Sequence, residues 1–202
     1  IVPSGHGNPI AVVINDNDGT PHSGTAMALE DSSPGTTYPE SDMPSVSPFS
    51  GITTSNSLED ASQDKNGYSK TWNEFGYSPV VAAKGGLSGS YRQPFASATN
   101  VSKWYLPAAG EWADAFEKLF FGSRTIVPAG VDDWSGICYP AAIETVTGGP
   151  MSQWYWTSST INWSWLGFGI NGSDGYTHMD SASGSGSYTM PTALSVRSFI
   201  HF

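Results

Sequence analysis

Two aromatic-rich segments constrain the fold of this chain more than any other feature of its sequence. They read WYLPAAGEW at 104–112 and WYWTSST at 154–160, and they hold four of the eight tryptophans in a chain of 202 residues. Each buried aromatic ring removes a large apolar area from water, so this concentration predicts a rigid core built around the two segments. The rings that we expect in that core are Trp104, Trp112, Trp154 and Trp156.

Composition narrows both the class of protein and its partners. Eighteen Asp and Glu against eight Lys and Arg give a net charge of −10, which argues against nucleic acid and anionic membranes as partners. Charged residues make up only 13% of the chain, as in loop-rich β or α+β proteins. We expect residues 1–202 to form a single α+β domain with a loop excursion at 31–57. No apolar run approaches the roughly 20 residues that span a bilayer, so we expect no direct membrane insertion.

The N-terminal part of the chain predicts one hairpin and several short helices. A β-branched run at 10–14 is followed by the turn sequence NDNDG, and residues 25–29 are placed to return as its partner strand. Residues 58–84 allow short helical turns, and Pro79 fits the first turn of one of them.

The clearest helix follows Pro107. Apolar side chains recur there at helical spacing, and Gly122 is a natural stop for the helix. The side chains that form this stripe are Trp112, Phe116, Leu119 and Phe120.

The last fifty residues predict β-structure. The expected strands cover 154–157, 163–170, 176–180 and 194–202. Asn-Gly-Ser-Asp-Gly at 171–175 is a hairpin turn that joins the second strand to the third. In the last strand, alternation places Leu194, Val196, Ile200 and Phe202 on one face, and Arg197 and His201 on the other. We expect this last strand to share a sheet with the strand at 10–14.

No constellation in the sequence supports catalysis or a metal site. The histidines lack the spacing of a zinc site; they are His6, His22, His178 and His201. The turn at 16–18 resembles the start of a calcium loop, but the required Gly and distal Glu do not follow. We expect Glu111 to be a first-turn carboxylate stabilised by the helix N-terminus, and Ser158 and Ser159 to hold turn backbone. The sequence thus predicts no catalytic residue, no metal ligand and no cofactor, with a structural calcium ion left open.

Three motifs follow one another along the chain. They are W-Y-L-P-x-x-x-E-W at 104–112, Y-W-[ST]-S-[ST] within 155–160, and V-R-x-F at 196–199. Together they resemble bacterial C-type-lectin-like domains of the branch related to the formylglycine-generating-enzyme fold, over about residues 8–202. The resemblance implies small twisted antiparallel sheets, two flanking helices and long loops. In that family the first motif opens the second helix, the second is a core strand, and the third closes the sheet.

Two departures from that family narrow the activity that the resemblance implies. The single cysteine, Cys138, is incompatible with oxidase chemistry that uses paired cysteines or bound copper. The E-P-N, Q-P-D and W-N-D tripeptides of calcium-dependent sugar-binding lectins are absent from the sequence. The resemblance therefore implies a scaffold and a binding surface rather than either of those activities.

The same branch includes the variable proteins of diversity-generating retroelements, in which adenine-directed mutagenesis diversifies the last fifty or so residues. By this resemblance, 150–202 is the candidate variable region, and 161–180 is the stretch that binds the ligand. The side chains expected in one solvent-facing binding patch are Asn162, Ser164, Leu166, Phe168, Tyr176 and His178.

Two assignments within 161–180 stay open on the sequence alone. Leu166, Phe168 and Ile170 share a strand face that could equally belong to the core. Trp163 and Trp165 border a polar stretch, where a ring is either buried or half exposed for contact with a ligand.

The function expected from the sequence is non-enzymatic ligand binding or adhesion, with a protein or glycan on another cell or surface as the ligand. The resemblance implies a place outside the cell, on the bacterial surface or anchored there as a lipoprotein, or on a phage tail. The alternatives are a fimbrial or stalk module, a carbohydrate-binding domain, and an enzyme of the same fold that has lost its cysteines.

Overall fold

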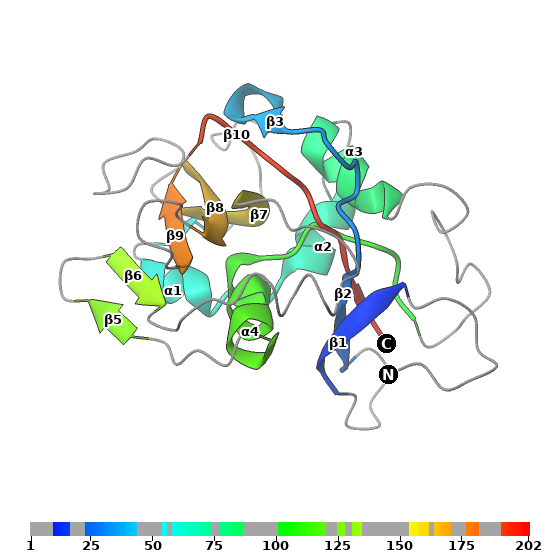
Figure 1. Cartoon of the computed structure of the whole chain (residues 1–202), viewed down its shortest axis with the longest axis horizontal. Helices are drawn as coiled ribbons and strands as arrows, with labels where there is room; N and C mark the ends of the chain where they lie inside the picture. The colour runs from blue at the N-terminus through cyan, green and yellow to red at the C-terminus, as the bar shows by residue number, and fades with distance from the viewer. Residues whose placement is uncertain are drawn as a thin grey trace.

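The computed structural model combines α-helices with small sheets around aromatic cores (Figure 1). It describes residues 10–16, 23–43, 54–55, 58–73, 77–86, 101–119, 125–127, 131–134, 154–161, 164–170, 177–181 and 191–202. The expected α+β class is confirmed, because the helices accompany mainly antiparallel strands.

The first sheet joins the two ends of the described chain. It has the order β1 (Ala11–Asn15), β2 (Thr25–Ala28) and β11 (Phe199–His201), and both pairings are antiparallel. Gly24 and Phe202 extend the pairing of β2 and β11 through reciprocal backbone hydrogen bonds of 3.0 and 3.1 Å. The predicted hairpin is confirmed, and so is the shared sheet of the first and last strands, with β2 lying between them.

The prediction of one continuous last strand is wrong. Strand β10 (Ala193–Leu194) pairs with β3 (Tyr38–Pro39) in a separate two-stranded sheet, and β11 starts only at Phe199. Between them the backbone of Ser195 bonds to strand β7, and the carbonyl of Val196 accepts from Ser32. The pairing partner thus changes every one or two residues, so the predicted common face of Leu194, Val196, Ile200 and Phe202 does not form.

The largest sheet has six strands and carries the C-terminal hairpin. Its order is β4 (Thr54–Ser55), β7 (Trp154–Ile161), β8 (Ser164–Ile170), β9 (Thr177–Ser181), β6 (Val131–Trp134) and β5 (Thr125–Val127). All neighbours are antiparallel except β4 and β7. Ile170 pairs with Thr177, as the predicted β8–β9 hairpin requires, while its turn at 171–175 lies outside the described residues.

The excursion at 31–57 contains two short strands, β3 in the two-stranded sheet and β4 in the six-stranded sheet. It also contains a 3-10 turn, η1 (Glu40–Asp42). Each strand has only two residues, too few for a sequence pattern to reveal. Their partners, β10 and β7, lie more than a hundred residues further along the chain. The excursion is therefore attached to the sheets at two points.

Four α-helices occur in the described ranges, instead of the two flanking helices that the resemblance implies. They are α1 (Leu58–Ser62), α2 (Gly67–Asn73), α3 (Ser78–Gly85) and α4 (Ala109–Leu119). Helix α3 carries Pro79 in its first turn, as predicted. Helix α4 matches the predicted helix after Pro107, and the expected stop at Gly122 lies outside the described residues. Helices α1 and α2 are five and seven residues long, too short for a clear apolar period.

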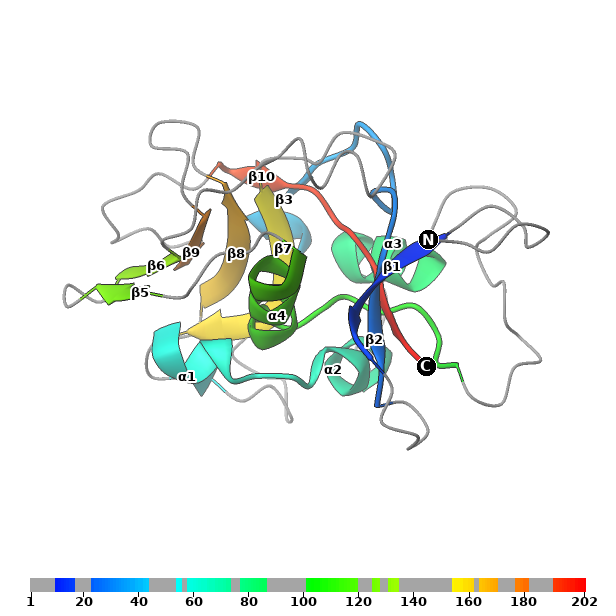
Figure 2. The same ribbon diagram turned by 60° about the horizontal axis from the view of Figure 1, so that its bottom comes forward.

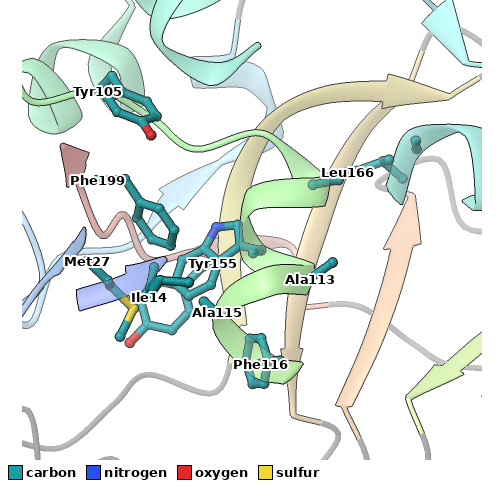
Figure 3. Close-up of a cluster of buried hydrophobic side chains, with 12 residues drawn as sticks. Ile14, Met27, Tyr105, Ala113, Ala115, Phe116, Tyr155, Leu166 and Phe199 are labelled. Carbon is teal, nitrogen blue, oxygen red and sulfur yellow. The ribbon is translucent and has the colours of Figure 1, made fainter. Parts of the chain in front are cut away.

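The three sequence motifs meet in one hydrophobic cluster beside α4. The ring of Trp112 stacks on Tyr155 with centroids 4.8 Å apart, and meets Phe199 edge-on at 5.0 Å. Figure 3 shows side chains from β1, β2, β7, β8 and β11 converging on this helix. Trp112 and Trp156 are both 0% exposed, so their predicted burial is confirmed. Trp104 and Trp154 are buried as well.

A second cluster covers the opposite face of β7. Trp154, Trp156 and Trp165 pack there with side chains from α3 and from the chain around β10. Trp165 is only 4% exposed, which decides between its two predicted states in favour of burial. Trp163 lies outside the described residues. Strand β7 is therefore buried on both faces and forms the centre of the molecule (Figure 2).

Candidate functional site

The predicted binding residues are divided between two neighbouring strands. Ser164, Leu166 and Phe168 lie on β8, and His178 lies on β9, opposite Gly169. Asn162 and Tyr176 lie outside the described residues, as do the side chains of Ser164, Phe168 and His178. The structure thus brings four positions together in the backbone of one hairpin.

Leu166 does not belong to a solvent-facing patch. Its side chain is 0% exposed and packs in the cluster beside α4. The reason is its position on an interior strand with a core on both sides, since Trp165 fills the other face. Of the two states predicted for Leu166, the core state is the correct one. Position 168 lies on the same strand face, opposite the buried Tyr155, so the candidate surface is limited to the remaining positions.

The carboxyl of Glu111 is buried, and its pKa departs strongly from its ordinary value. Its Oε1 accepts from the Tyr105 hydroxyl at 2.8 Å, and its Oε2 accepts from the backbone N–H of Ala108 at 2.7 Å. Burial raises the pKa of this carboxyl to about 8, against the opposing effect of these two donors. The bond to Ala108 is the backbone half of a capping box, so Glu111 has the first-turn role that the sequence predicts.

Two further N–H groups at the start of α4 donate to residues from other segments. Ala109 donates to the Ser159 hydroxyl at 2.9 Å, and Gly110 donates to the carbonyl of Asp64 at 3.0 Å. The same Ser159 hydroxyl donates to Asp64 Oδ2 at 2.6 Å, and Lys70 forms an ion pair with that oxygen. Ser159 therefore caps a helix fifty residues away, which is a structural use of the hydroxyl.

The start of α2 approaches this cap so closely that a side chain has no room. A Cβ added to Gly67 would lie 2.3 Å from Glu111 Oε2 and 2.7 Å from the backbone nitrogen of Ala108. Glycine at position 67 therefore allows the start of α2 to lie directly against the buried carboxylate of Glu111.

His201 completes the polar group around Glu111. Its ring stacks on Tyr105 at 4.7 Å, and its Nδ1 lies 3.5 Å from the Tyr105 hydroxyl and 3.4 Å from Thr25 Oγ1. Its Nε2 is 3.7 Å from Glu111 Oε1, and 19% of its side chain is exposed. Chemically, this arrangement can exchange protons with solvent at the edge of a buried acid, and it ties β11 to α4.

Arg197 holds a second buried carboxylate. Its Nε and Nη2 donate to Asp31 Oδ1 at 2.8 and 2.7 Å, and the Tyr155 hydroxyl donates to the same oxygen at 3.0 Å. Arg197 is 0% exposed, so it does not share an outer strand face with His201 as predicted. The sequence carries no signal for this pair, because Asp31 and Arg197 are separated by 166 residues.

Metal and membrane features are limited to what the described residues show. Among them, no group of three or more His, Cys, Asp or Glu side chains is placed to hold a metal ion. Within the same ranges, no helix has the length and apolar character needed to cross a membrane. The single cysteine, Cys138, and two of the histidines, His6 and His22, lie outside these ranges.

Comparisons with known proteins do not assign this chain to a family. No protein-family model, curated protein or solved structure matches it. The resemblance to C-type-lectin-like domains therefore stays an expectation from the three sequence motifs.

Proposed function

We propose that this chain is a non-enzymatic binding domain with a C-type-lectin-like fold, which presents a ligand-binding surface on its C-terminal hairpin. Its ligand is a protein or glycan on another cell or surface, and its setting is the bacterial surface or a phage tail. The observation that carries the proposal is a difference between β7 and the neighbouring hairpin. Strand β7 is buried and bonded within the protein, whereas the hairpin holds the predicted binding positions.

The three motif segments form the scaffold. Every residue of 154–160 is buried, and the Ser159 and Thr157 hydroxyls are bonded within the protein. Glu111 and Arg197, the charged residues of the other two motifs, are also buried and bonded internally. These side chains hold the fold together, which supports a structural role for the motifs.

The proposed binding surface lies on the hairpin β8–β9 and its flanking residues, at 161–180. The backbone of β8 is held in register by β7, from Trp154 opposite Gly169 to Ile161 opposite Ser164. A backbone fixed by its neighbouring strands can present different side chains without a change of fold, as binding loops do on rigid scaffolds. The proposed surface comprises Asn162, Ser164, Tyr176 and His178. Phe168 is left out, because it lies two positions after the buried Leu166 on the same strand, opposite the buried Tyr155.

A block variant of the hairpin tests this proposal. We would replace Asn162, Ser164, Tyr176 and His178 together with Ala, and assay the full chain on a glycan array and on intact cells from a bacterial panel. We expect the melting temperature to stay within about 5 °C while binding is lost, because surface substitutions cost little stability. Unfolding of the variant without selective loss of binding would favour a stalk module instead, and binding that survives would place the binding surface outside the hairpin. The matched control is Glu117→Ala with Lys118→Ala, two exposed positions on α4.

The retroelement part of the proposal has its own test in DNA. A variable protein requires a near-repeat of the DNA that encodes residues 150–202, with adenines at the positions that differ, and a neighbouring reverse transcriptase gene. Sequencing the locus in several isolates checks both. Identical codons in all isolates and no repeat would remove diversification from the proposal and leave ligand binding to the block variant.

A further inference from the structure

A lysine and a carboxylate meet with little exposure to solvent between α1 and α2. Lys70 Nζ, on α2, forms an ion pair with Asp64 Oδ2 six positions earlier, and the two side chains are only 7% and 11% exposed. The chain between α1 and α2 passes beneath α4 in Figure 2, and the carbonyl of Asp64 accepts from the Gly110 N–H at 3.0 Å. Taking two charges out of water costs free energy that their attraction only partly offsets. A reaction that removes both charges would relieve that cost.

The two oxygens of the Asp64 carboxyl group have different partners, and each partner suits one step of amide formation. The Asn66 N–H donates to Oδ1 at 3.1 Å, where negative charge develops when an amine adds to the carboxyl carbon. The Ser159 hydroxyl donates to Oδ2 at 2.6 Å, and Lys70 Nζ contacts the same oxygen. Hydrogen bonds to Oδ2 stabilise it as a leaving oxygen, while Lys70 supplies both the amine and the protons.

The backbone on both sides of the pair is fixed by hydrogen bonds. Asp64 N–H donates to the carbonyl of Ala61 at 3.0 Å, and Lys70 N–H donates to the carbonyl of Asn66 at 3.0 Å. Reacting groups that a rigid frame holds in contact react as if each were present at a very high concentration. The fold therefore supplies the positioning that an uncatalysed condensation in water lacks.

We propose that Lys70 and Asp64 condense to an intramolecular isopeptide bond. The Lys70 ammonium first gives one proton to Asp64 Oδ2, which leaves a neutral amine beside a neutral carboxylic acid. Nζ then adds to Cγ, the Cγ–Oδ2 bond breaks, and a second proton from Nζ leaves with Oδ2 as water. The amide keeps Oδ1 as its carbonyl oxygen and one hydrogen on Nζ, so the reaction consumes no oxidant and no second substrate. The bond does not rest on the function proposed for the hairpin.

A second lysine and carboxylate in the same region form a natural control. Lys65 pairs with Asp114, and their side chains are 44% and 29% exposed. Water solvates both charges there, which favours separate ions over an amide. The proposal therefore predicts condensation at Lys70 and none at Lys65.

Intact mass spectrometry of the full chain tests for the bond directly. After incubation of the folded wild type and denaturation, we expect chains that are lighter than their sequence by the mass of one water molecule. Trypsin should fail to cleave those chains after Lys70, because an amidated lysine carries no charge, and tandem mass spectrometry should find residue 64 joined to residue 70. Protein kept in denaturant throughout should retain its full mass, because only the fold brings the two groups together.

Two variants assign the reaction to these residues. Lys70→Arg keeps a positive charge beside Asp64, but the guanidinium stays protonated and does not condense, so this variant should retain its full mass. Lys65→Gln, the matched control at the exposed pair, should still lose water. Thermal unfolding shows whether each variant is folded. If Lys70→Arg does not fold, the wild type decides alone, because the joined peptide is either present or absent.

Three results would overturn the isopeptide bond. They are full mass in every molecule of the incubated wild type, a loss of water that maps to other residues, and a loss of water that persists in Lys70→Arg. The mass of the chain is independent of any ligand, and the Ala block in the hairpin should leave the bond in place. A failure here therefore leaves the hairpin proposal untouched, and the reverse also holds.

Discussion

Asp31 and Glu111 are both buried carboxylates, but their surroundings differ in kind. Asp31 meets the permanent cation of Arg197 through two donors on one oxygen. Glu111 is held by neutral donors, the Tyr105 hydroxyl and the Ala108 N–H, and the nearest ring nitrogen of His201 is 3.7 Å away. At Asp31 the negative charge is compensated by the positive charge of Arg197. Glu111 instead stabilises a helix N-terminus, and its charge depends on pH.

The contrast separates two ways of using a carboxyl group to join distant segments. Removing one partner of a buried ion pair strongly destabilises the fold, because the other charge is left uncompensated. A buried carboxyl without a permanent cation can become neutral instead, so the free-energy cost of burying it varies with pH. The variants below test whether the two sites differ in this way.

The largest effect is expected at the ion pair. Arg197→Ala would leave the buried carboxylate of Asp31 without its cation, and we expect a loss of about 3–5 kcal/mol in the free energy of unfolding. Chemical denaturation measures this loss. The double variant Asp31→Asn with Arg197→Met is the control, since it removes both charges and should be more stable than Arg197→Ala. A double variant as unstable as the single one would show that charge compensation is not what Arg197 contributes.

The pH dependence of stability should come from the other site. The pKa of Glu111 is raised to about 8 in the folded state, so its contribution to stability is complete at acidic pH and is lost as pH rises through about 8. We expect the free energy of unfolding to fall by up to about 1.4 kcal/mol per pH unit between about pH 5.5 and 7.5. Denaturation at several pH values measures the slope.

Glu111→Gln is the variant that assigns this slope. The amide keeps the shape of the carboxyl but cannot ionise, so the difference in stability between wild type and variant should change steadily over this pH range. Asp64, Lys65, Tyr105 and His201 also face the carboxyl, and they remain in both proteins. An equal pH slope in the two proteins would place the titration on one of those groups.

A smaller effect is expected at the helix cap. Ser159→Ala leaves the buried N–H of Ala109 without its acceptor and removes a donor from Asp64, so we expect a loss of about 1–2 kcal/mol. Ser159→Thr keeps the hydroxyl and is the matched control. If both variants lose the same stability, the cause is packing around position 159 rather than the hydrogen bonds.

The smallest effect is expected at the surface pair of Lys65 and Asp114. Lys65 is 44% exposed on its side chain, and pairs of this kind contribute less than about 1 kcal/mol because solvent screens them. Lys65→Gln should also shift the midpoint of the Glu111 titration slightly upward, since this cation favours the charged carboxylate. Stability measured against pH for Lys65→Gln checks both expectations. A shift downward would contradict the assigned role of Lys65.

Local sequence patterns predicted much of the fold and little of the candidate functional site. The apolar spacing after Pro107 located α4, and the runs at 10–14 and 25–29 located a hairpin that the structure confirms. The same patterns missed the two strands of the 31–57 excursion, whose two-residue lengths leave no period to detect. Alternation in 161–180 left Leu166 open, because alternation identifies a face and not what covers it.

Residue types by themselves determined that the motif tryptophans are buried, that β8 and β9 form a hairpin, and that Glu111 serves the first turn of α4. Those properties depend on neighbours within a few positions or on ring size. Only the tertiary structure decided that the last strand divides at Arg197, that Ser159 caps α4 and that Leu166 lies in the core. These depend on partners that packing brings together from 50 to 166 residues away, and no local period encodes that choice.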